Sequence, residues 1–169
     1  MTKIKRTSIA FEKHNHNECS KNAMRVAEEY CTDSGLNFTP IRRKVLEILL
    51  QEHRAIGAYT ILEQLRKAGF SSQPPVAYRA LEFLVENRFA HKIERLNAFV
   101  ACTLPGDSHC DNHSPAFMIC RQCDTVAETR SVSPDFDISK IAQSTGFRIE
   151  QTVIEAEGLC NSCAEIEKS

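Results

Sequence analysis

Two Cys-x-x-Cys pairs in the last third of this 169-residue chain constrain its fold more than any other feature. The pairs are Cys120 with Cys123 and Cys160 with Cys163. Each pair can direct two thiolates at one ion, so the two pairs together form a closed tetrahedral site of the kind that zinc fills. The sequence therefore predicts a structural zinc ion held by these four cysteines.

The stretch between the two pairs, residues 124–159, is longer than the roughly 15–20 residues of a compact zinc ribbon. A strand–helix–strand unit fits into that length, so we expect the metal to hold together a small α/β domain. The alternative is a thioredoxin-like redox pair. One pair would suffice for that chemistry, and no βαβ pattern precedes either pair.

Composition places the chain among ordinary globular proteins, with 42% hydrophobic and 25% charged residues. It has no apolar run long enough to span a membrane and no apolar segment near its start that resembles a secretory signal. We therefore expect a cytoplasmic protein whose cysteines are reduced and serve as thiolate ligands, with neither a membrane nor a small-molecule substrate as a partner.

The charge is unevenly divided along the chain. Residues 1–102 carry 16 Lys and Arg against 11 Asp and Glu, whereas residues 103–169 carry 5 against 11. A basic half joined to an acidic half fits a nucleic-acid-binding module attached to a second domain.

Hydrophobic periodicity predicts four helices and then a β-hairpin in the basic half. The helices are expected over residues 18–31, 40–52, 58–68 and 75–87, and the strands over 89–94 and 98–102. Thr39 and Pro40 suit the N-cap and first position of the second helix. A hairpin directly after a helix-turn-helix is a wing, so residues 18–102 are expected to form a winged helix-turn-helix DNA-binding domain behind a mobile tail, residues 1–17.

The remainder reads as a hinge and a second domain. Residues 103–114 lack periodicity and are expected to form the hinge. Strands are expected over 116–119, 125–129 and 147–156, with a helix from about 133 to 144 that turns Ile138 and Ile141 inward. The predicted fold class is thus α+β: a winged helix-turn-helix domain followed by a small α/β dimerisation domain, residues 115–169, stapled by a four-cysteine zinc site.

The start of the second helix of a helix-turn-helix enters the major groove of DNA. Here that segment is residues 75–79. Arg79 can donate two hydrogen bonds to a guanine edge or pair with a phosphate, and Tyr78 can contact the sugar-phosphate backbone. The alternative for Arg79 is an exposed arginine on a solvated helix face.

Three cations, Arg42, Arg43 and Lys44, fall in the first turn of the predicted second helix. Each opposes the helix dipole there by roughly 0.3–1 kcal/mol, which a bound phosphate would offset. They are therefore candidate contacts to the DNA backbone, and Tyr59 is a further candidate. A tolerated basic surface is the alternative.

A second set of ligand-type residues surrounds the hinge: His91, Cys102, His113 and Glu128. Two imidazoles, one thiolate and one carboxylate can form a tetrahedral zinc site, and the thiolate favours zinc over iron or manganese. Such a site would join the wing, the hinge and the second domain. A lone histidine is more often an ordinary surface or core residue, and His109, Cys110 and Asp111 in the same loop are rival or supplementary ligands.

Taken together, these motifs resemble the ferric uptake regulator (Fur) family. The resemblance covers about residues 20–165. It rests on three runs, residues 38–42 (Phe-Thr-Pro-Ile-Arg), 74–84 (Pro-Pro-Val-Ala-Tyr-Arg-Ala-Leu-Glu-Phe-Leu) and 90–94 (Ala-His-Lys-Ile-Glu), and on both Cys-x-x-Cys pairs, all in the family's order.

Within the family the chain is most similar to the zinc-sensing members. Iron-sensing members carry a His-His-Asp-His run before the first cysteine pair, where this chain has Cys110-Asp111-Asn112-His113. The family's zinc regulators use a His, Cys, His, Glu regulatory site, and His91, Cys102, His113 and Glu128 fall on those positions.

The resemblance implies a zinc-responsive transcriptional repressor of zinc-uptake genes, with one structural and one regulatory zinc ion per subunit. It also implies a homodimer formed by the C-terminal domains, with each recognition helix in one half-site of an AT-rich palindromic operator. The chain departs from the family at Val76 and Ala77, which replace a Thr-Val pair and remove a hydroxyl that could cap the helix or contact phosphate.

Three other functions remain open at this point. A same-family sensor of iron, manganese or peroxide would share the fold. A zinc-dependent hydrolase could use Glu128 as its base, but a catalytic zinc needs an open coordination position that four protein ligands would close. A thiol redox protein would exchange dithiol and disulfide at Cys120 and Cys123. We expect a DNA-binding repressor and no enzymatic activity.

Overall fold

The computed structural model describes residues 16–51, 53–70, 73–102, 116–129, 138–150 and 152–167. In the first half these residues form α1 (His16–Asp33), α2 (Pro40–Leu49), β1 (Ile56–Gly57), α3 (Ala58–Lys67), α4 (Pro74–Glu86), β2 (Ala90–Ile93) and β3 (Ala98–Ala101). The second half contains β4 (Ala116–Cys120), β5 (Val126–Thr129), α5 (Ile138–Thr145), β6 (Ile154–Gly158) and α6 (Asn161–Glu167). The mixed helix-and-strand class is confirmed. Among the described helices, none combines the length and the apolar character needed to cross a membrane.

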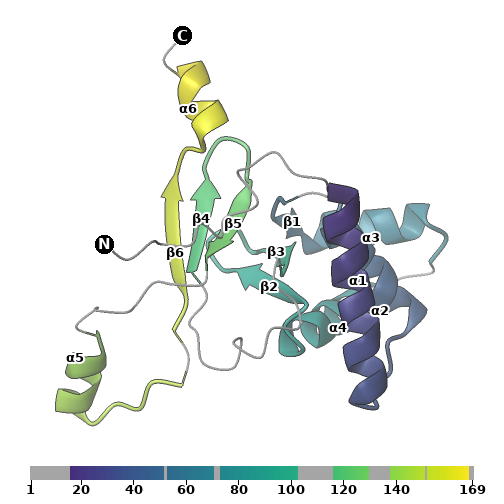
Figure 1. The fold of residues 1–169 in the computed structure, drawn as a ribbon, viewed down its shortest axis with the longest axis horizontal. Helices are drawn as coiled ribbons and strands as arrows, with labels where there is room; N and C mark the ends of the chain where they lie inside the picture. The colour runs from purple at the N-terminus through teal and green to yellow at the C-terminus, as the bar shows by residue number, and fades with distance from the viewer. Residues whose placement is uncertain are drawn as a thin grey trace.

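Helices α1 to α4 pack together at one end of the molecule (Figure 1). The predicted start of α2 is confirmed, because the Thr39 side chain accepts a hydrogen bond from the backbone N–H of Arg42 and Pro40 is the first helical residue. α2 ends at Leu49, a few residues before the expected end at residue 52. The four helices share a buried apolar core whose members include Ala27, Leu46, Leu65 and Leu84.

A three-stranded sheet in the order β1-β3-β2 combines the hairpin that follows α4 with a short strand between α2 and α3. The predicted hairpin is present: β2 and β3 are antiparallel, and His91 pairs with Val100. The short strand β1, which was not predicted, pairs with β3 through Ile56 and Phe99. The order of α2, α3, α4 and the hairpin is consistent with a winged helix-turn-helix.

A second three-stranded sheet has the order β5-β4-β6, with β4 antiparallel to β5 and parallel to β6. β5 runs back along β4, so that its last residue, Thr129, and the first residue of β6, Ile154, both pair with Ala116; α5 lies in the connection between them (Figure 1). The segment between the two cysteine pairs thus holds a strand, a helix and a strand, as its length predicted.

Two details of the second half were predicted wrongly. Ile138 and Ile141 are exposed to 46% and 58%, and the buried residue of α5 is Ala142, because this helix stands away from the sheet (Figure 1). The strand expected from residue 147 begins only at Ile154, where the pairing with Ala116 of β4 starts. Phe147, ahead of that pairing, is exposed.

The two sheets pack against each other through a small apolar cluster. Ile93 of β2 and Val100 of β3 meet Phe117 and Ile119 of β4 and Val126 of β5, and all five side chains are buried. Burial of apolar surface in this cluster stabilises the contact between the two halves of the chain. The packing of the two sheets at this cluster therefore determines which metal-ligand residues of the two halves lie close together.

Candidate metal centres and DNA-binding face

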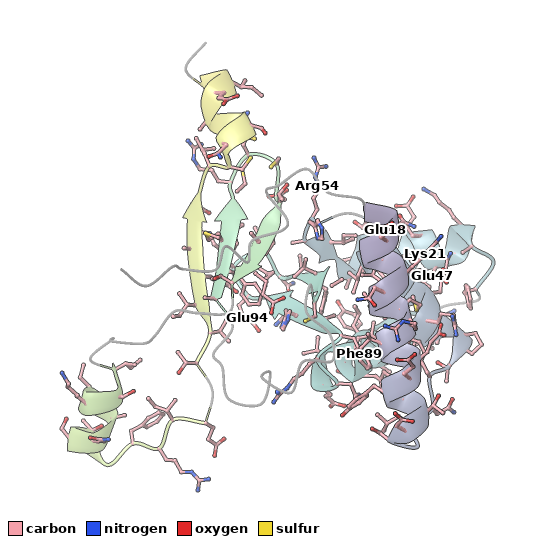
Figure 2. All side chains as sticks on the ribbon, in the orientation of Figure 1. Glu18, Lys21, Glu47, Arg54, Phe89 and Glu94 are labelled. Carbon is pink, nitrogen blue, oxygen red and sulfur yellow. The ribbon has the colours of Figure 1, made fainter. Side chains whose placement is uncertain are left out.

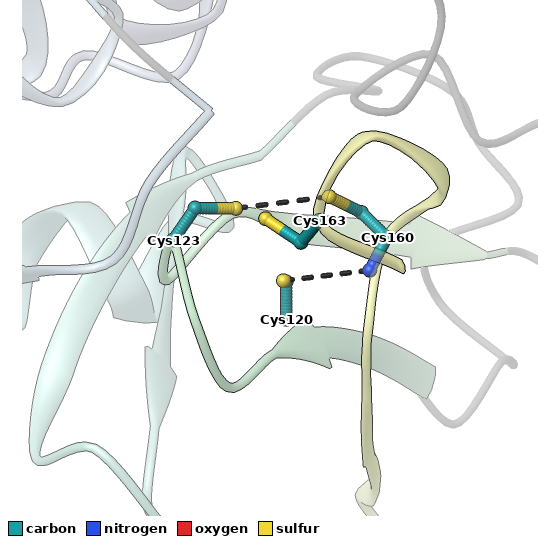
Figure 3. Close-up of side chains that lie close together, drawn as sticks. All are labelled: Cys120, Cys123, Cys160 and Cys163. Carbon is teal, nitrogen blue, oxygen red and sulfur yellow. Dashed lines mark hydrogen bonds between the residues drawn. The ribbon is translucent and has the colours of Figure 1, made fainter. Parts of the chain in front are cut away.

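The four paired cysteines converge at the far end of the second sheet. Cys120 ends β4 and Cys123 lies in the turn that follows, while Cys160 precedes α6 and Cys163 lies in its first turn. Figure 3 shows their sulfur atoms directed at one another, and all four lie within 4.8 Å of each other. The Sγ atoms of Cys123 and Cys160 are 3.8 Å apart. A tetrahedral ion with metal–sulfur bonds of about 2.3 Å requires sulfur atoms about 3.8 Å apart, so this donor set fits zinc.

The thiols of Cys120 and Cys163 differ in pKa, so they differ in how readily they ionise to bind a metal. Burial raises the pKa of Cys120, but backbone N–H groups of Cys160, Gln122 and Cys123 outweigh it and lower the pKa to about 6. Of these, the N–H of Cys160 lies 3.4 Å from the Cys120 sulfur. A hydrogen bond with Cys160, together with burial, raises the pKa of Cys163 to about 12. Without a cation these thiols therefore do not all ionise near neutral pH, and a divalent ion must displace protons to bind.

A second cluster forms where the two halves of the chain meet. His91 of β2, Cys102 just after β3 and Glu128 of β5 place one ligand atom each within 4.8 Å of the others. The Nε2 atom of His91 lies 3.1 Å from Oε1 of Glu128, and both side chains are largely buried. This nitrogen is buried and forms no hydrogen bond to any described residue. A metal ion shared by the three side chains would satisfy a nitrogen whose burial is otherwise costly.

Packing between the sheets brings these three residues together. The ring of His91 lies against the ring of Phe117 at a centroid distance of 5.1 Å, and Phe117 pairs with Glu128 across β4 and β5. On the other side, the backbone N–H of Cys102 donates to the carbonyl of Phe89 at 2.9 Å. The fourth expected ligand, His113, and the rival ligands His109, Cys110 and Asp111 lie outside the described residues.

Three candidate DNA contacts are accessible on α3 and α4. Tyr59, near the start of α3, is 80% exposed, and Tyr78 and Arg79, in the first half of α4, are also exposed. Arg79 forms no ion pair with any residue in the described ranges. The N-cap residue of α4, Gln73, makes no side-chain capping bond. Val76, where the sequence lacks a hydroxyl, lies three positions after this N-cap, so the effect of the missing hydroxyl on DNA binding stays a prediction.

The three cations at the start of α2 all have partners within the chain. Arg42 donates to the carbonyl of Asn37, and its guanidinium carbon lies 3.7 Å from the ring centroid of Phe83. Arg43 pairs with Glu28 of α1, and Lys44 pairs with Glu47 at 2.9 Å. These contacts offset the unfavourable helix dipole without a phosphate. The role of the three cations in DNA binding therefore stays a prediction.

Sequence reasoning missed several residues around the metal clusters. Thr125 places its hydroxyl 3.1 Å from the Cys123 sulfur, and its neighbour Asp124 accepts a backbone hydrogen bond from Ala55 at 3.2 Å. The only signal available was the position of Thr125 just after the first Cys-x-x-Cys pair. Glu155 and Glu157, at alternate positions of β6, contact the turn between β2 and β3 and were missed as well.

No family model matches the chain. Curated relatives do: the zinc uptake regulation protein of Escherichia coli K12 is 38% identical over 141 residues, which cover 83% of this chain and 81% of that protein. The solved structure of a zinc uptake regulator complexed with zinc and DNA is 35% identical, with a TM-score of 0.79 over 93% of this chain and all of that one.

A further relative has been solved in two forms. The holo form of XcZur is 35% identical and gives a TM-score of 0.74 over 85% of this chain and 98% of that one. The apo form is 34% identical, but its TM-score is 0.50 over 87% of this chain and 99% of that one. The structure described here is therefore more similar to the holo arrangement. The identity and coverage of these relatives show that the chain belongs to the ferric uptake regulator family and, within it, is most like the zinc uptake regulators.

Proposed function

We propose that this chain is a zinc-responsive transcriptional repressor that binds operator DNA as a zinc-loaded homodimer and represses zinc-uptake genes. The observation that carries the proposal is the cluster of His91, Cys102 and Glu128 at the junction of the two sheets. Its buried imidazole nitrogen lacks a hydrogen bond to the described residues, and its three ligands come from both halves of the chain. A metal bound there would link the hairpin to the C-terminal sheet.

The two clusters have different tasks in this proposal. The four cysteines surround one end of the second sheet and hold a structural zinc ion that maintains the C-terminal part. His91, Cys102 and Glu128, with His113 as the fourth ligand, hold the regulatory ion. Zinc supplies a cation that accepts sulfur, nitrogen and oxygen ligands in tetrahedral geometry. The thiolate of Cys102 favours zinc over manganese or iron, which supports zinc as the signal.

DNA binding rests on α4. Arg79 and Tyr78 would reach base edges and backbone in the major groove, and Tyr59 on α3 would contact the flanking backbone. The net positive charge of residues 1–102 supports DNA as the partner of this part of the chain. Residues 18–102 would form the DNA-binding domain and residues 115–169 the dimerisation domain, with a tail and a hinge, residues 1–17 and 103–114, around them.

Regulation follows from the position of the second cluster. Two half-sites of an operator have a fixed spacing, so only one relative placement of the two recognition helices engages both. Ligands from β2, from the residue just after β3 and from β5 can be held by one ion only when the hairpin is docked on the C-terminal sheet. Zinc therefore favours the docked state, and the size of the shift is limited by its differential affinity for the two states. The greater similarity to the holo form of XcZur supports this view.

Exposed apolar residues on α5 support the homodimer. Ile138 and Ile141 lie one turn apart on α5, and Phe147 follows it, with exposures of 46%, 58% and 69%. In addition, β6 is an edge strand of its sheet. An apolar helix face and an open sheet edge on the same domain are features that a second subunit would cover.

The test is a measurement of zinc content together with DNA binding. Duplexes selected from a random pool by the zinc-loaded protein serve as the operator. We expect two zinc ions per subunit, and removal of the weaker one by a mild chelator should abolish operator binding while the fold persists. A single tightly held ion with chelator-insensitive DNA binding would contradict the proposal. Iron or manganese that restores binding better than zinc would indicate a sensor of another metal, and restoration by peroxide treatment would indicate a peroxide sensor.

A further inference from the structure

The turn of the β2–β3 hairpin is held by the last strand of the C-terminal sheet. The two carboxylate oxygens of Glu155 accept hydrogen bonds from the backbone N–H groups of Glu94 at 2.8 Å and Arg95 at 3.1 Å. The Nε of Arg95 also lies 2.5 Å from a carboxylate oxygen of Glu157. Figure 2 shows Glu94 at the end of β2 that points toward the C-terminal sheet. Two side chains of β6, Glu155 and Glu157, thus bind the turn of the hairpin.

The backbone geometry of both partners produces this contact. Glu155 and Glu157 are two residues apart on β6, so their side chains project from the same face of the sheet. Pairing with Phe117 and Ile119 of β4 fixes the position of that face. On the hairpin side, the strand pairing ends at Ile93, so the next two backbone N–H groups have no partner in the ladder and are available to a carboxylate.

The turn itself presents these N–H groups in a fixed arrangement. The N–H of Asn97 donates to the carbonyl of Glu94 at 3.1 Å, which closes a tight turn, and Asn97 has a φ of 45°. One carboxylate can then accept from two consecutive amides. Hydrogen bonds to an ionised acceptor are stronger than neutral ones, whereas the exposed Arg95–Glu157 ion pair contributes little by itself. Glu155 is therefore the principal contact and Glu157 an accessory one.

The Glu155 contact and the His91–Cys102–Glu128 cluster lie at opposite ends of the same strand, β2. His91 lies near the start of β2, and Glu94 follows its end. The metal ligands fix the first part of the strand against β5, and Glu155 fixes the turn against β6. The contact to Glu155 needs no metal, so it stabilises the docked state both with and without zinc.

We propose that Glu155, assisted by Glu157, is a metal-independent latch that sets how much zinc the protein needs to close on DNA. The proposal rests on the proposed function, because it assumes that docking of the hairpin is the DNA-binding state. A latch that stabilises the docked state lowers the free zinc needed to populate it. Loss of the latch should therefore raise that requirement without removing any metal ligand.

The experiment compares the wild type with Glu155→Ala in the full-length protein. Hydrogen exchange, followed residue by residue by NMR, should show protection of the Glu94 and Arg95 amides in the wild type and its loss in the variant. Amides within the β2–β3 ladder should stay protected in both. Half-maximal binding to the selected duplex should need about tenfold more free zinc in the variant, with zinc content and binding at saturating zinc unchanged.

Two variants serve as controls. Glu29→Ala removes an exposed carboxylate that pairs with Arg25 within α1, so it changes the net charge equally and should leave the zinc requirement unchanged. Glu157→Ala should shift it by less than about threefold. If Glu155→Ala fails to fold, Glu155→Gln keeps the shape and one carbonyl acceptor, and it should release one of the two amides and give an intermediate shift.

The outcomes separate the two proposals. If DNA binding by the wild type does not change with the free zinc concentration, the proposed function fails. Protection of the Glu94 and Arg95 amides would then still show whether Glu155 holds the turn. If zinc controls DNA binding but Glu155→Ala leaves both amides protected, or leaves the zinc requirement at the wild-type value, the latch is overturned.

Discussion

The imidazole Nε2 of His91 lies 3.1 Å from a carboxylate oxygen of Glu128, although the two residues belong to different sheets and are 37 positions apart in sequence. Both side chains are largely buried, and the buried nitrogen of His91 has no hydrogen-bond partner among the described residues. Two ligand-type groups this close together, with the Cys102 sulfur beside them, have the arrangement expected of a metal site. This relationship couples the hairpin to the C-terminal sheet.

Substitution of Cys102 by serine should remove the regulatory metal and leave the structural one. A hydroxyl is a much poorer zinc ligand than a thiolate, so we expect zinc affinity at this site to fall by at least about a hundredfold. Zinc content should drop by one ion per subunit, and DNA binding at limiting zinc should be lost. Mass spectrometry of the native protein and fluorescence anisotropy with the selected duplex measure these two quantities.

The matched control is Cys31→Ala. Cys31 is buried in α1, away from both clusters, and burial raises the pKa of its thiol, which makes it a poor metal ligand. This variant should keep the full zinc content and zinc-dependent DNA binding. Unchanged behaviour of Cys102→Ser would refute the regulatory assignment.

Substitution of Cys123 by serine should instead destabilise the C-terminal part. A metal held by the four cysteines would contribute directly to folding, since structural sites of this kind in small domains contribute on the order of 10 kcal/mol. Loss of one ligand should therefore lower the free energy of unfolding by several kcal/mol and separate the melting of the two halves. Calorimetry with and without a strong chelator would detect this, and equal melting curves for wild type and variant would contradict a structural role.

The affinity of the four-cysteine site for zinc should depend on pH in a specific way. Protons compete with the metal for thiolates, so affinity falls as pH falls. Cys120, with a pKa of about 6, carries no proton at pH 7.5 and regains it below pH 6, whereas Cys163, with a pKa of about 12, must release its proton throughout this range. Binding should thus release fewer than four protons at pH 7.5 and one more at pH 5.

Calorimetric titration with zinc in buffers of different ionisation enthalpy counts these protons. The Cys102→Ser variant isolates the four-cysteine site for this measurement. A release that stays the same between pH 7.5 and pH 5 would show that Cys120 is not an ionised thiolate in the metal-free protein.

Local patterns allowed most of the fold to be predicted. The Thr39-Pro40 start, the apolar faces of α2 to α4 and the two short strand-like runs of β2 and β3 are properties of neighbouring residues, and the structure has these elements within a few positions of the expected bounds. The strand β1 was missed because two residues, Ile56 and Gly57, carry no periodicity of their own. They become a strand only through pairing with β3.

Errors in the second half have a common cause. Ile138 and Ile141 were assigned inward because their spacing forms an apolar face, but spacing does not identify the surface that covers that face. Similarly, the apolar residues from Phe147 onward suggested a strand that starts too early, because pairing with β4 decides where β6 begins. Both errors concern residues whose partners lie outside their own element.

Of the two metal clusters, one could be predicted from local spacing and the other could not. The Cys-x-x-Cys spacing predicts the four-cysteine cluster on its own. The contact between His91, Cys102 and Glu128 depends on how the two sheets pack, and only the family resemblance selected these residues among the ligand types near the hinge. Neither the cysteine spacing nor the family resemblance could predict contacts made by backbone groups. Examples are the amides that lower the pKa of Cys120 and those that bind Glu155.

Arg79 and Arg42 should respond differently to truncation. Arg79 is exposed and unpaired among the described residues, so Arg79→Ala should weaken specific DNA binding by about 1–3 kcal/mol and leave stability unchanged. Arg42 packs over Phe83, so Arg42→Ala should cost about 1 kcal/mol of stability and change DNA binding less. Thermal melts and binding to specific and scrambled duplexes measure both. A loss of stability in Arg79→Ala would argue against the DNA assignment.

Substitution of Ile141 by glutamate should break the homodimer. In the isolated chain this side chain is 58% exposed, so a charge there costs little stability in a monomer. In a dimer that covers α5 the same charge would be desolvated without a partner, at a cost of several kcal/mol. We expect sedimentation of zinc-loaded Ile141→Glu as a monomer with an unchanged zinc content, and loss of tight binding to a duplex with two half-sites. Lys140→Glu, an exposed change on the neighbouring position, controls for charge alone. If Ile141→Glu remains dimeric and, like Lys140→Glu, behaves as the wild type, then α5 is not part of the interface.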